Sequence, residues 1–149
     1  MTNEDTMRCP TLNWTDASEY TCTVRFALAE RPGVFAGHFP TQAVLPGVVQ
    51  VRWVREVLRA WEGRMVDASS LPPVTLSAIS QMKFVKPVTP NDTVELVLTR
   101  GKTSPTLIEF HYYALRGGER VVTAHGKVRT SRALALEDAS TPPQSESAS

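Results

Sequence analysis

The sequence predicts a single domain of the α+β class, in which one long helix packs against an antiparallel β-sheet. Residues 46–61 carry apolar side chains at intervals of three and four, which is typical of an amphipathic helix. Residues 20–28 alternate apolar and polar side chains, which is typical of a half-buried strand, and similar segments follow the helix. A length of 149 residues corresponds to about one domain.

The helix has the clearest boundaries. Pro46 stands near its first turn, where the missing N–H of proline costs nothing, and Gly63 marks its end. Val54 and Leu58 belong to a wide apolar stripe, while polar residues such as Gln50 fill the positions between. We expect the stripe to pack on one face of the sheet.

Four further strand candidates form a meander after the helix. Gly117-Gly118 joins the last two and is typical of a tight hairpin, while Asn91-Asp92 predicts the turn between the first two. The candidates are residues 74–85, 93–99, 107–115 and 120–130.

The ends of the chain differ in composition from its middle. Residues 133–149 are rich in Ser, Pro, Ala and acidic residues without periodicity, which predicts a disordered tail. We expect residues 1–15 to be flexible as well, so that residues 16–132 form the domain.

Charge and cysteine content exclude several classes of protein. The 16 Lys and Arg residues against 15 Asp and Glu give a net charge of +1, which excludes a nucleic-acid binder that relies on a strongly basic face. No apolar run is long enough to span a bilayer and the first residues lack a signal-peptide pattern, so we expect a cytoplasmic protein. Cys9 and Cys22 follow no disulfide or metal pattern, which favours reduced thiols that pack as small apolar groups.

Four short blocks carry a resemblance to a known family. In their order and spacing they resemble the hotdog-fold β-hydroxyacyl-acyl-carrier-protein dehydratases of fatty-acid synthesis, over about residues 19–130. The second block, continued as PGVVQVRW, is more similar still to the dehydratase-like hotdog proteins of aryl polyene pigment pathways. The blocks are Phe35-Ala36-Gly37-His38-Phe39-Pro40, Val44-Leu45-Pro46-Gly47-Val48-Val49-Gln50, Lys83-Phe84-Val85-Lys86-Pro87-Val88 and Asn91-Asp92-Thr93-Val94-Glu95-Leu96.

The resemblance implies a hotdog fold, an antiparallel sheet wrapped around one long central helix, in a homodimer or a heterodimer with a related hotdog subunit. Each active site would combine the His38 loop of one protomer with the helix of the other. The substrate would arrive as a thioester on the phosphopantetheine arm of an acyl carrier protein, with no other cofactor and no metal. The residues expected to bind it are Phe39, Pro40, Val48, Trp53 and Phe84.

Removal of water from a 3-hydroxyacyl thioester sets three chemical tasks. A base must take the proton next to the carbonyl, donors must stabilise the enolate-like oxygen, and an acid must assist the departing hydroxyl. His38 suits the first task, because an imidazole with a pKa of about 6.5 accepts and returns protons near neutral pH. Gly47 suits the second, because the first N–H groups of a helix lack partners and carry partial positive charge; alternatively, Pro46-Gly47 only starts the helix.

The third task is where the sequence departs from the family. The resemblance places a catalytic Glu or Asp at the fifth residue after Gly47, and this chain has Arg52 there. A guanidinium neither accepts a proton nor readily gives one up at neutral pH. We favour a plain ion pair of Arg52 with Glu56, or a solvent-facing Arg52, over hydrogen bonds from Arg52 to substrate. Glu56 lies about 6 Å farther along the helix, so it replaces the acid only if the helix shifts or a water intervenes. Alternatively, a related hotdog subunit completes a composite site.

Several other residues have two interpretations each. Trp53 is expected to fill the core rather than line an acyl tunnel. Lys83 and Lys86 either steer an acidic carrier protein or are simply solvated. His111 and His125 lack metal-ligand spacing, and a surface or dimer contact suits His111 best.

Three functions remain open on the sequence alone. The favoured one is a dehydratase, or a dehydratase-like subunit, that acts on carrier-bound 3-hydroxyacyl chains in fatty-acid or polyene pigment synthesis. The second is a hotdog thioesterase, which would release a free acid. The third is a non-catalytic partner that binds acyl carriers within a hetero-oligomer, and Arg52 is its strongest support.

Overall fold

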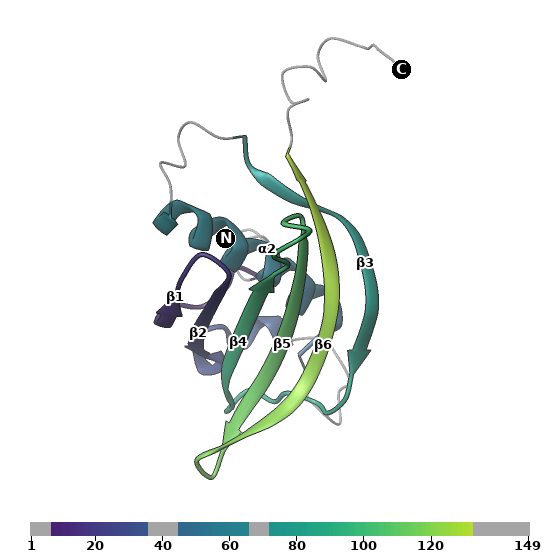
Figure 1. Cartoon of the computed structure of the whole chain (residues 1–149). Helices are drawn as coiled ribbons and strands as arrows, with labels where there is room; N and C mark the ends of the chain where they lie inside the picture. Colours follow the sequence, from purple (N-terminus) through teal and green to yellow (C-terminus); the bar gives the residue numbers. More distant parts are fainter. Residues whose placement is uncertain (1–6, 36–44, 66–71, 133–149) are drawn as a thin grey trace.

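The chain forms one antiparallel sheet that curls around a long helix (Figure 1). The computed structural model describes residues 7–35, 45–65 and 72–132. Within them, helix α2 (Gly47–Met65) lies against six strands in the order β1-β2-β4-β5-β6-β3. The strands are β1 (Asn13–Ala17), β2 (Thr21–Ala27), β3 (Val74–Phe84), β4 (Thr93–Arg100), β5 (Leu107–Arg116) and β6 (Glu119–Arg132), and two short 3-10 helices, η1 (Leu28–Glu30) and η2 (Pro32–Phe35), follow β2.

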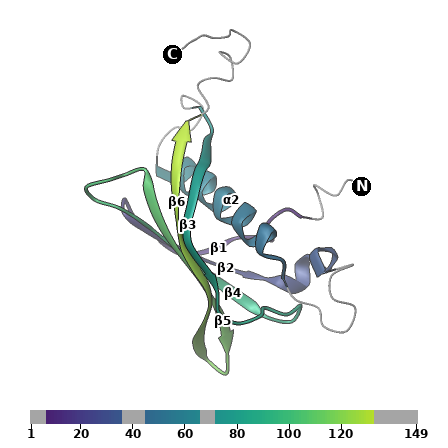
Figure 2. The ribbon, with the colours of Figure 1, turned by 90° about the vertical axis from the view of Figure 1, so that its right-hand side faces the viewer.

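Alternation along the strands builds the core. In β4, Val94, Leu96 and Leu98 are fully buried and share one face, because every second side chain of a strand points the same way. Helix α2 covers that face (Figure 2). Removing such a side chain from water contributes roughly 1.5–3 kcal/mol, so this interface supplies much of the stability. The α+β class predicted from the sequence is confirmed.

The described N-terminal segment is better packed than the sequence predicts. Residues 7–15 were expected to be flexible, yet Asn13 opens β1, which pairs with β2. Ahead of it, the Cys9 N–H donates to Glu56 Oε1 at 3.0 Å and the indole of Trp53 donates to the Met7 carbonyl at 2.7 Å. The segment therefore covers α2. The expected tail, residues 133–149, lies outside the described residues.

The β5–β6 hairpin forms as predicted. Gly117 and Gly118 have φ of +59° and +81°, and they join the paired residues Arg116 and Glu119. Positive φ at both central positions is the geometry of the two-residue hairpin turn that matches strand twist. A side chain with a Cβ would be strained at either glycine.

The helix is longer than its sequence pattern indicates. It continues past Gly63 to Met65. In this last turn, the Arg64 guanidinium lies 4.5 Å from the ring centre of Trp14 in β1. Packing of this kind offsets the weak helix propensity of glycine, which costs only about 1 kcal/mol.

A buried carboxylate links three strands on the sheet face that α2 does not cover. The Glu95 side chain in β4 is 2% exposed, and its oxygens accept from Arg25 Nε at 2.8 Å and Arg120 Nε at 2.5 Å. The Arg120 guanidinium also lies 4.5 Å from the ring centre of Tyr113 in β5. One carboxylate thus ties β2 and β6 to β4.

Replacing Glu95 with Gln should therefore lower the free energy of unfolding by about 1.5–3 kcal/mol, the usual worth of hydrogen bonds to a charged group. Urea unfolding followed by circular dichroism measures the change. The matched control is Glu109→Gln, since Glu109 is an exposed carboxylate on β5. Equal midpoints for the two variants would show that the Glu95 cluster adds no stability.

Candidate active site

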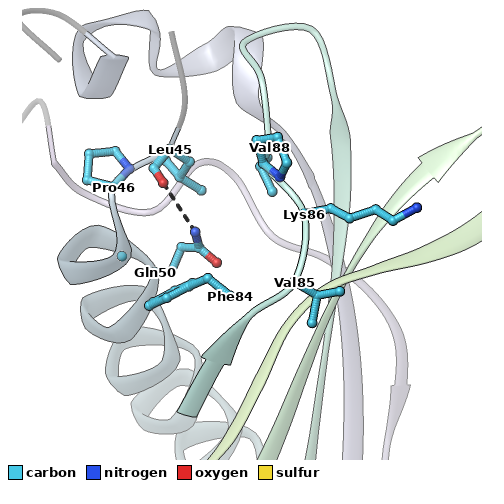
Figure 3. Close-up of a pocket in the computed structure, with 9 residues that line it drawn as sticks. Leu45, Pro46, Gln50, Phe84, Val85, Lys86 and Val88 are labelled. Carbon is cyan, nitrogen blue, oxygen red and sulfur yellow. Dashed lines mark hydrogen bonds between the residues drawn. The ribbon is translucent and has the colours of Figure 1, made fainter. Parts of the chain in front are cut away.

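A pocket of about 360 Å³ opens between the N-terminus of α2 and the loop between β3 and β4 (Figure 3). Apart from the amide of Gln50 and the ammonium of Lys86, its side chains are apolar. The lining residues are Leu45, Pro46, Gly47, Gln50, Phe84, Val85, Lys86, Pro87 and Val88.

The first turn of α2 supplies hydrogen-bond donors to this pocket. The N–H groups of Val49 and Gln50 both donate to the Pro46 carbonyl at 3.2 Å. The N–H groups of Gly47 and Val48 precede these bonds, so they have no partner within the helix. Together with the helix dipole, they form an environment suited to a carbonyl oxygen that gains negative charge.

Glycine at position 47 lets the ring of Phe84 lie close against the helix. A Cβ at Gly47 would lie 2.5 Å from Phe84 Cζ. Figure 3 shows the Phe84 ring beside the first turn of α2. Phe84 is 52% exposed, so its ring lines the pocket and has room to move. Gly47, singled out from the sequence, therefore lines the pocket, and its part in the chemistry stays a prediction.

Backbone hydrogen bonds hold the opposite wall in place. The Leu45 N–H donates to the Val88 carbonyl at 2.8 Å, which joins the entry to α2 to the β3–β4 loop. Farther along this loop, Asp92 accepts from Arg116 Nη2 at 2.7 Å. Burial raises the pKa of Asp92, but the bonds from Arg116 and Thr89 outweigh it and hold the pKa below its ordinary value. The carboxylate therefore stays ionised and keeps the loop in position.

Arg52 and Glu56 form the ion pair that their spacing predicts. Arg52 Nε lies 2.6 Å from Glu56 Oε2, and the other carboxylate oxygen accepts the Cys9 N–H. Neither residue lines the pocket at Gly47. Both oxygens of Glu56 are thus already hydrogen-bonded, and a catalytic part for either residue stays a prediction.

The other expected site residues lie in different environments. Trp53 is fully buried, and its ring meets that of Phe26 edge-on at 5.3 Å, so it belongs to the core. Val48 is 76% exposed at the start of α2. Lys83 and Lys86 are exposed, and Lys86 lies at the pocket. His38, Phe39 and Pro40 lie outside the described residues.

The sequence did not single out Gln50 as a site residue. It is only 4% exposed, and its Nε2 donates to the Leu45 carbonyl at 3.3 Å. Among the residues that the structure describes, nothing bonds to its Oε1. The available signal was position: Gln50 stands three residues after Gly47 and four before Val54, on the side of the helix that faces inward.

Two further polar groups come together on the outer face of the sheet. His111 and His125 are cross-strand partners whose ring centres lie 5.8 Å apart. In the described ranges 7–35, 45–65 and 72–132, no three His, Cys, Asp or Glu side chains are grouped to hold a metal.

Both cysteines are buried free thiols, as expected. Burial raises the pKa of the Cys22 thiol to about 12, and burial together with nearby Glu56 raises that of Cys9 further. Neither thiol is therefore a candidate nucleophile at neutral pH.

Comparison with known proteins now assigns the family. The model of the ApeI-like family, described as ApeI dehydratase, matches residues 14–127. This chain belongs to the ApeI-like family. The hotdog dehydratase resemblance of the sequence blocks is thereby confirmed.

Curated relatives of this ApeI-like chain include 3-hydroxyacyl-[acyl-carrier-protein] dehydratases named FabZ. The protein of Rhodopseudomonas palustris (strain TIE-1) is 36% identical over 91 residues, which are 60% of this chain and 60% of the relative. The protein of Sinorhizobium fredii (strain NBRC 101917 / NGR234) is 32% identical over 90 residues, 60% of this chain and 58% of the relative. The chain therefore spans about three fifths of the length of these curated relatives.

Solved structures confirm the hotdog fold. The dehydratase heterocomplex ApeI:P from Xenorhabdus doucetiae aligns with a TM-score of 0.64 and 25% identity, over 83% of this chain and 99% of that one. An acyl-CoA hydrolase from Staphylococcus aureus aligns with a TM-score of 0.54 and 13% identity, over 75% of this chain and 65% of that one, which is a likeness of fold alone. Within the described residues, no helix has the length and apolar character to cross a membrane.

Proposed function

We propose that this ApeI-like chain takes part in removing water from 3-hydroxyacyl thioesters carried by an acyl carrier protein, in fatty-acid or aryl polyene synthesis. The observation that supports this most directly is the start of α2. There the N–H groups of Gly47 and Val48 have no partner within the helix, and Gly47 lines an apolar pocket with room for an acyl thioester.

In the proposed reaction, the thioester oxygen accepts hydrogen bonds from the first turn of α2. The His38 imidazole takes a proton from C2, and the electron pair of that C–H bond moves toward the thioester oxygen to give an enolate. This pair then forms the C2–C3 double bond as the C3–O bond breaks, and the hydroxyl leaves as water after receiving a proton. The products are a 2-enoyl thioester and one water molecule.

The proton for the leaving hydroxyl is the unusual part of the proposal. Position 52 offers a guanidinium that is engaged with Glu56, rather than a carboxylic acid. We infer that a related hotdog subunit completes the site. A precedent is the similar dehydratase heterocomplex ApeI:P, which is an assembly of different chains. A non-catalytic role within such a hetero-oligomer is the second candidate, and the Arg52–Glu56 pair is the observation that favours it.

The surface around α2 and β3 supports a partner with acidic groups. Arg55 and Arg59 stand about one helical turn apart, and among the described residues Arg55 Nε is buried without an acceptor. The charge of Arg52 is already paired with Glu56. Burial, followed by the charge of Arg55, lowers the pKa of Arg59 from its ordinary value. Two identical copies with these faces in contact would repel each other, so carboxylates on a second subunit fit better.

The acyl carrier protein is proposed to dock beside the pocket. Lys83 and Lys86 flank the exposed ring of Phe84 at the end of β3. Exposed ammonium groups at this rim would attract an acidic carrier and would do so less at high salt.

Mass spectrometry of a carrier-bound 3-hydroxyacyl substrate tests the proposal. The chain is assayed alone and mixed with a second hotdog subunit. Loss of one water from the carrier-bound acyl group in either sample supports a dehydratase site. Release of the free acid would instead show a thioesterase, and binding without turnover in both samples would show a non-catalytic partner.

Substitution of Arg52 tests the position of the missing acid. Arg52→Asp should raise the dehydration rate of the chain assayed alone, by up to about 10²-fold, the lower end of the range for general acid catalysis. Arg52→Ala is the matched control, because it also breaks the pair with Glu56 but adds no carboxylic acid. Equal rates for the two variants would show that position 52 does not face the leaving hydroxyl.

A further inference from the structure

Gln50 presents an unsatisfied hydrogen-bond acceptor to the pocket at the start of α2. Its side chain is 4% exposed, and no described residue donates to Oε1. Figure 3 shows the amide with its nitrogen directed at Leu45 and its oxygen directed away from Leu45, on the pocket side. An acceptor left buried without a donor is costly, so the site is incomplete without one.

The orientation of this amide is fixed by its neighbours. The Leu45 carbonyl can only accept, so the group facing it at 3.3 Å must be the Nε2 donor. The turn that carries Gln50 is fixed as well, because the hydroxyl of buried Tyr112 donates to the Gln50 main-chain carbonyl at 2.5 Å. Oε1 therefore cannot exchange places with the nitrogen without losing a hydrogen bond.

Among the described residues that line the pocket, no side chain donates to Oε1. Leu45, Phe84, Val85, Pro87 and Val88 carry only hydrocarbon side chains, and the ammonium of Lys86 is exposed. A ligand that fills this pocket and displaces water from Oε1 is therefore favoured when it brings an O–H or N–H donor of its own.

The arrangement of donors and acceptor at the start of the helix narrows the choice of ligand. The N–H groups that lack a partner within the helix begin at Gly47, and the Gln50 amide folds back toward Leu45, so Oε1 lies near this first turn. A carbonyl oxygen with a hydroxyl two carbons away offers an acceptor and a donor that suit these two groups. An unsubstituted acyl chain lacks the second group, and a 3-oxo chain presents an acceptor to an acceptor.

We propose that Gln50 Oε1 accepts a hydrogen bond from the 3-hydroxyl of the acyl chain and so selects 3-hydroxyacyl thioesters for this pocket. The inference rests on the proposed function, which it deepens by naming the residue that recognises the hydroxyl. The amide neither gains nor loses a proton in this role. It fixes the C3–O bond while other groups carry out the chemistry.

Binding of unreactive analogues tests this assignment. The probes are pantetheine amides, with nitrogen in place of the thioester sulfur, that carry 3-hydroxyacyl, 3-oxoacyl or unsubstituted acyl chains of equal length. For the unaltered chain, calorimetry should give a Kd for the 3-hydroxy probe about tenfold lower than for either of the others, the worth of one hydrogen bond. Equal affinities for the three probes would overturn the inference without any mutation.

A variant then assigns the preference to one residue. Gln50→Met keeps an unbranched side chain of similar volume but removes the amide. The variant should raise the Kd of the 3-hydroxy probe about tenfold and leave the Kd of the unsubstituted probe unchanged. Thermal unfolding of the variant confirms that it folds.

Two other results would contradict the assignment. An equal loss for the two probes would indicate that Gln50 serves only the structure or meets a pantetheine amide instead, and N-ethyl amides of the same acyl chains, which lack the rest of the arm, separate these cases. An unchanged affinity for both probes would mean that Oε1 is satisfied by water. If the unaltered chain prefers the hydroxyl but no mixture of subunits dehydrates, the proposed function fails while the role of Gln50 stands.

Discussion

His38→Ala should lower the rate of dehydration by about 10²–10⁴-fold, the usual contribution of a general base. Alanine cannot take the proton from C2, and no other group at the start of α2 is a base: Gly47 and Val48 offer N–H donors, and Gln50 offers a neutral amide. The initial rate of enoyl formation on the carrier, followed by mass spectrometry in the most active subunit mixture, measures the effect.

The remaining histidines provide matched controls. His111 and His125 lie in β5 and β6 on the outer face of the sheet, and His111→Ala and His125→Ala should leave the rate unchanged. The rate should also fall as the pH drops below about 6.5, the ordinary pKa of imidazole, because a protonated ring cannot accept the C2 proton. A His38→Ala rate equal to that of the two controls would remove His38 from the mechanism.

Much of the fold could be predicted because most elements bury one regular face. Alternation in β4 places Val94, Leu96 and Leu98 inward, and α2 repeats its apolar side chains with the helical period. Such patterns are local, so they can be recognised in the sequence even when the elements that pack against them are unknown. The hairpin at Gly117-Gly118 is equally local, since positive φ is a property of the turn itself.

The first strand could not be predicted because its pattern is broken. The register of β1 against β2 shifts between Trp14 and Asp16, and this bulge interrupts the alternation. Cys9 and Met7 give no local signal either, because their partners Glu56 and Trp53 are more than forty residues away.

The candidate site likewise contains residues with a local sequence signal and residues whose roles depend on distant partners. The Arg52–Glu56 pair follows from a spacing of four in a helix, and Gly47 follows from its place after proline. Gln50 could not be assigned in this way, since its orphaned oxygen becomes visible only when Leu45 is seen to hold the nitrogen. The approach of His111 to His125 likewise depends on strand register, which no single segment determines.

Trp53→Ala should lower the free energy of unfolding by about 3–5 kcal/mol, which is the range for removing a large aromatic side chain from a core. Trp53 is fully buried, its ring packs edge-on against Phe26, and its indole N–H is bonded to the Met7 carbonyl. The substitution therefore creates a cavity and also releases the N-terminal segment from α2. Chemical denaturation followed by circular dichroism measures the loss.

This measurement also decides between the two interpretations of Trp53. Val48→Ala is the control on the same helix, and because Val48 is 76% exposed its midpoint should stay close to that of the unaltered chain. The unfolding midpoint of Trp53→Phe should lie between those of Trp53→Ala and Val48→Ala, because this variant keeps an aromatic ring but loses the hydrogen bond to Met7. If Trp53→Ala unfolded at the same denaturant concentration as Val48→Ala and changed only the acyl length that the chain accepts, Trp53 would line a tunnel, because a side chain that supports the core cannot be removed without cost to folding.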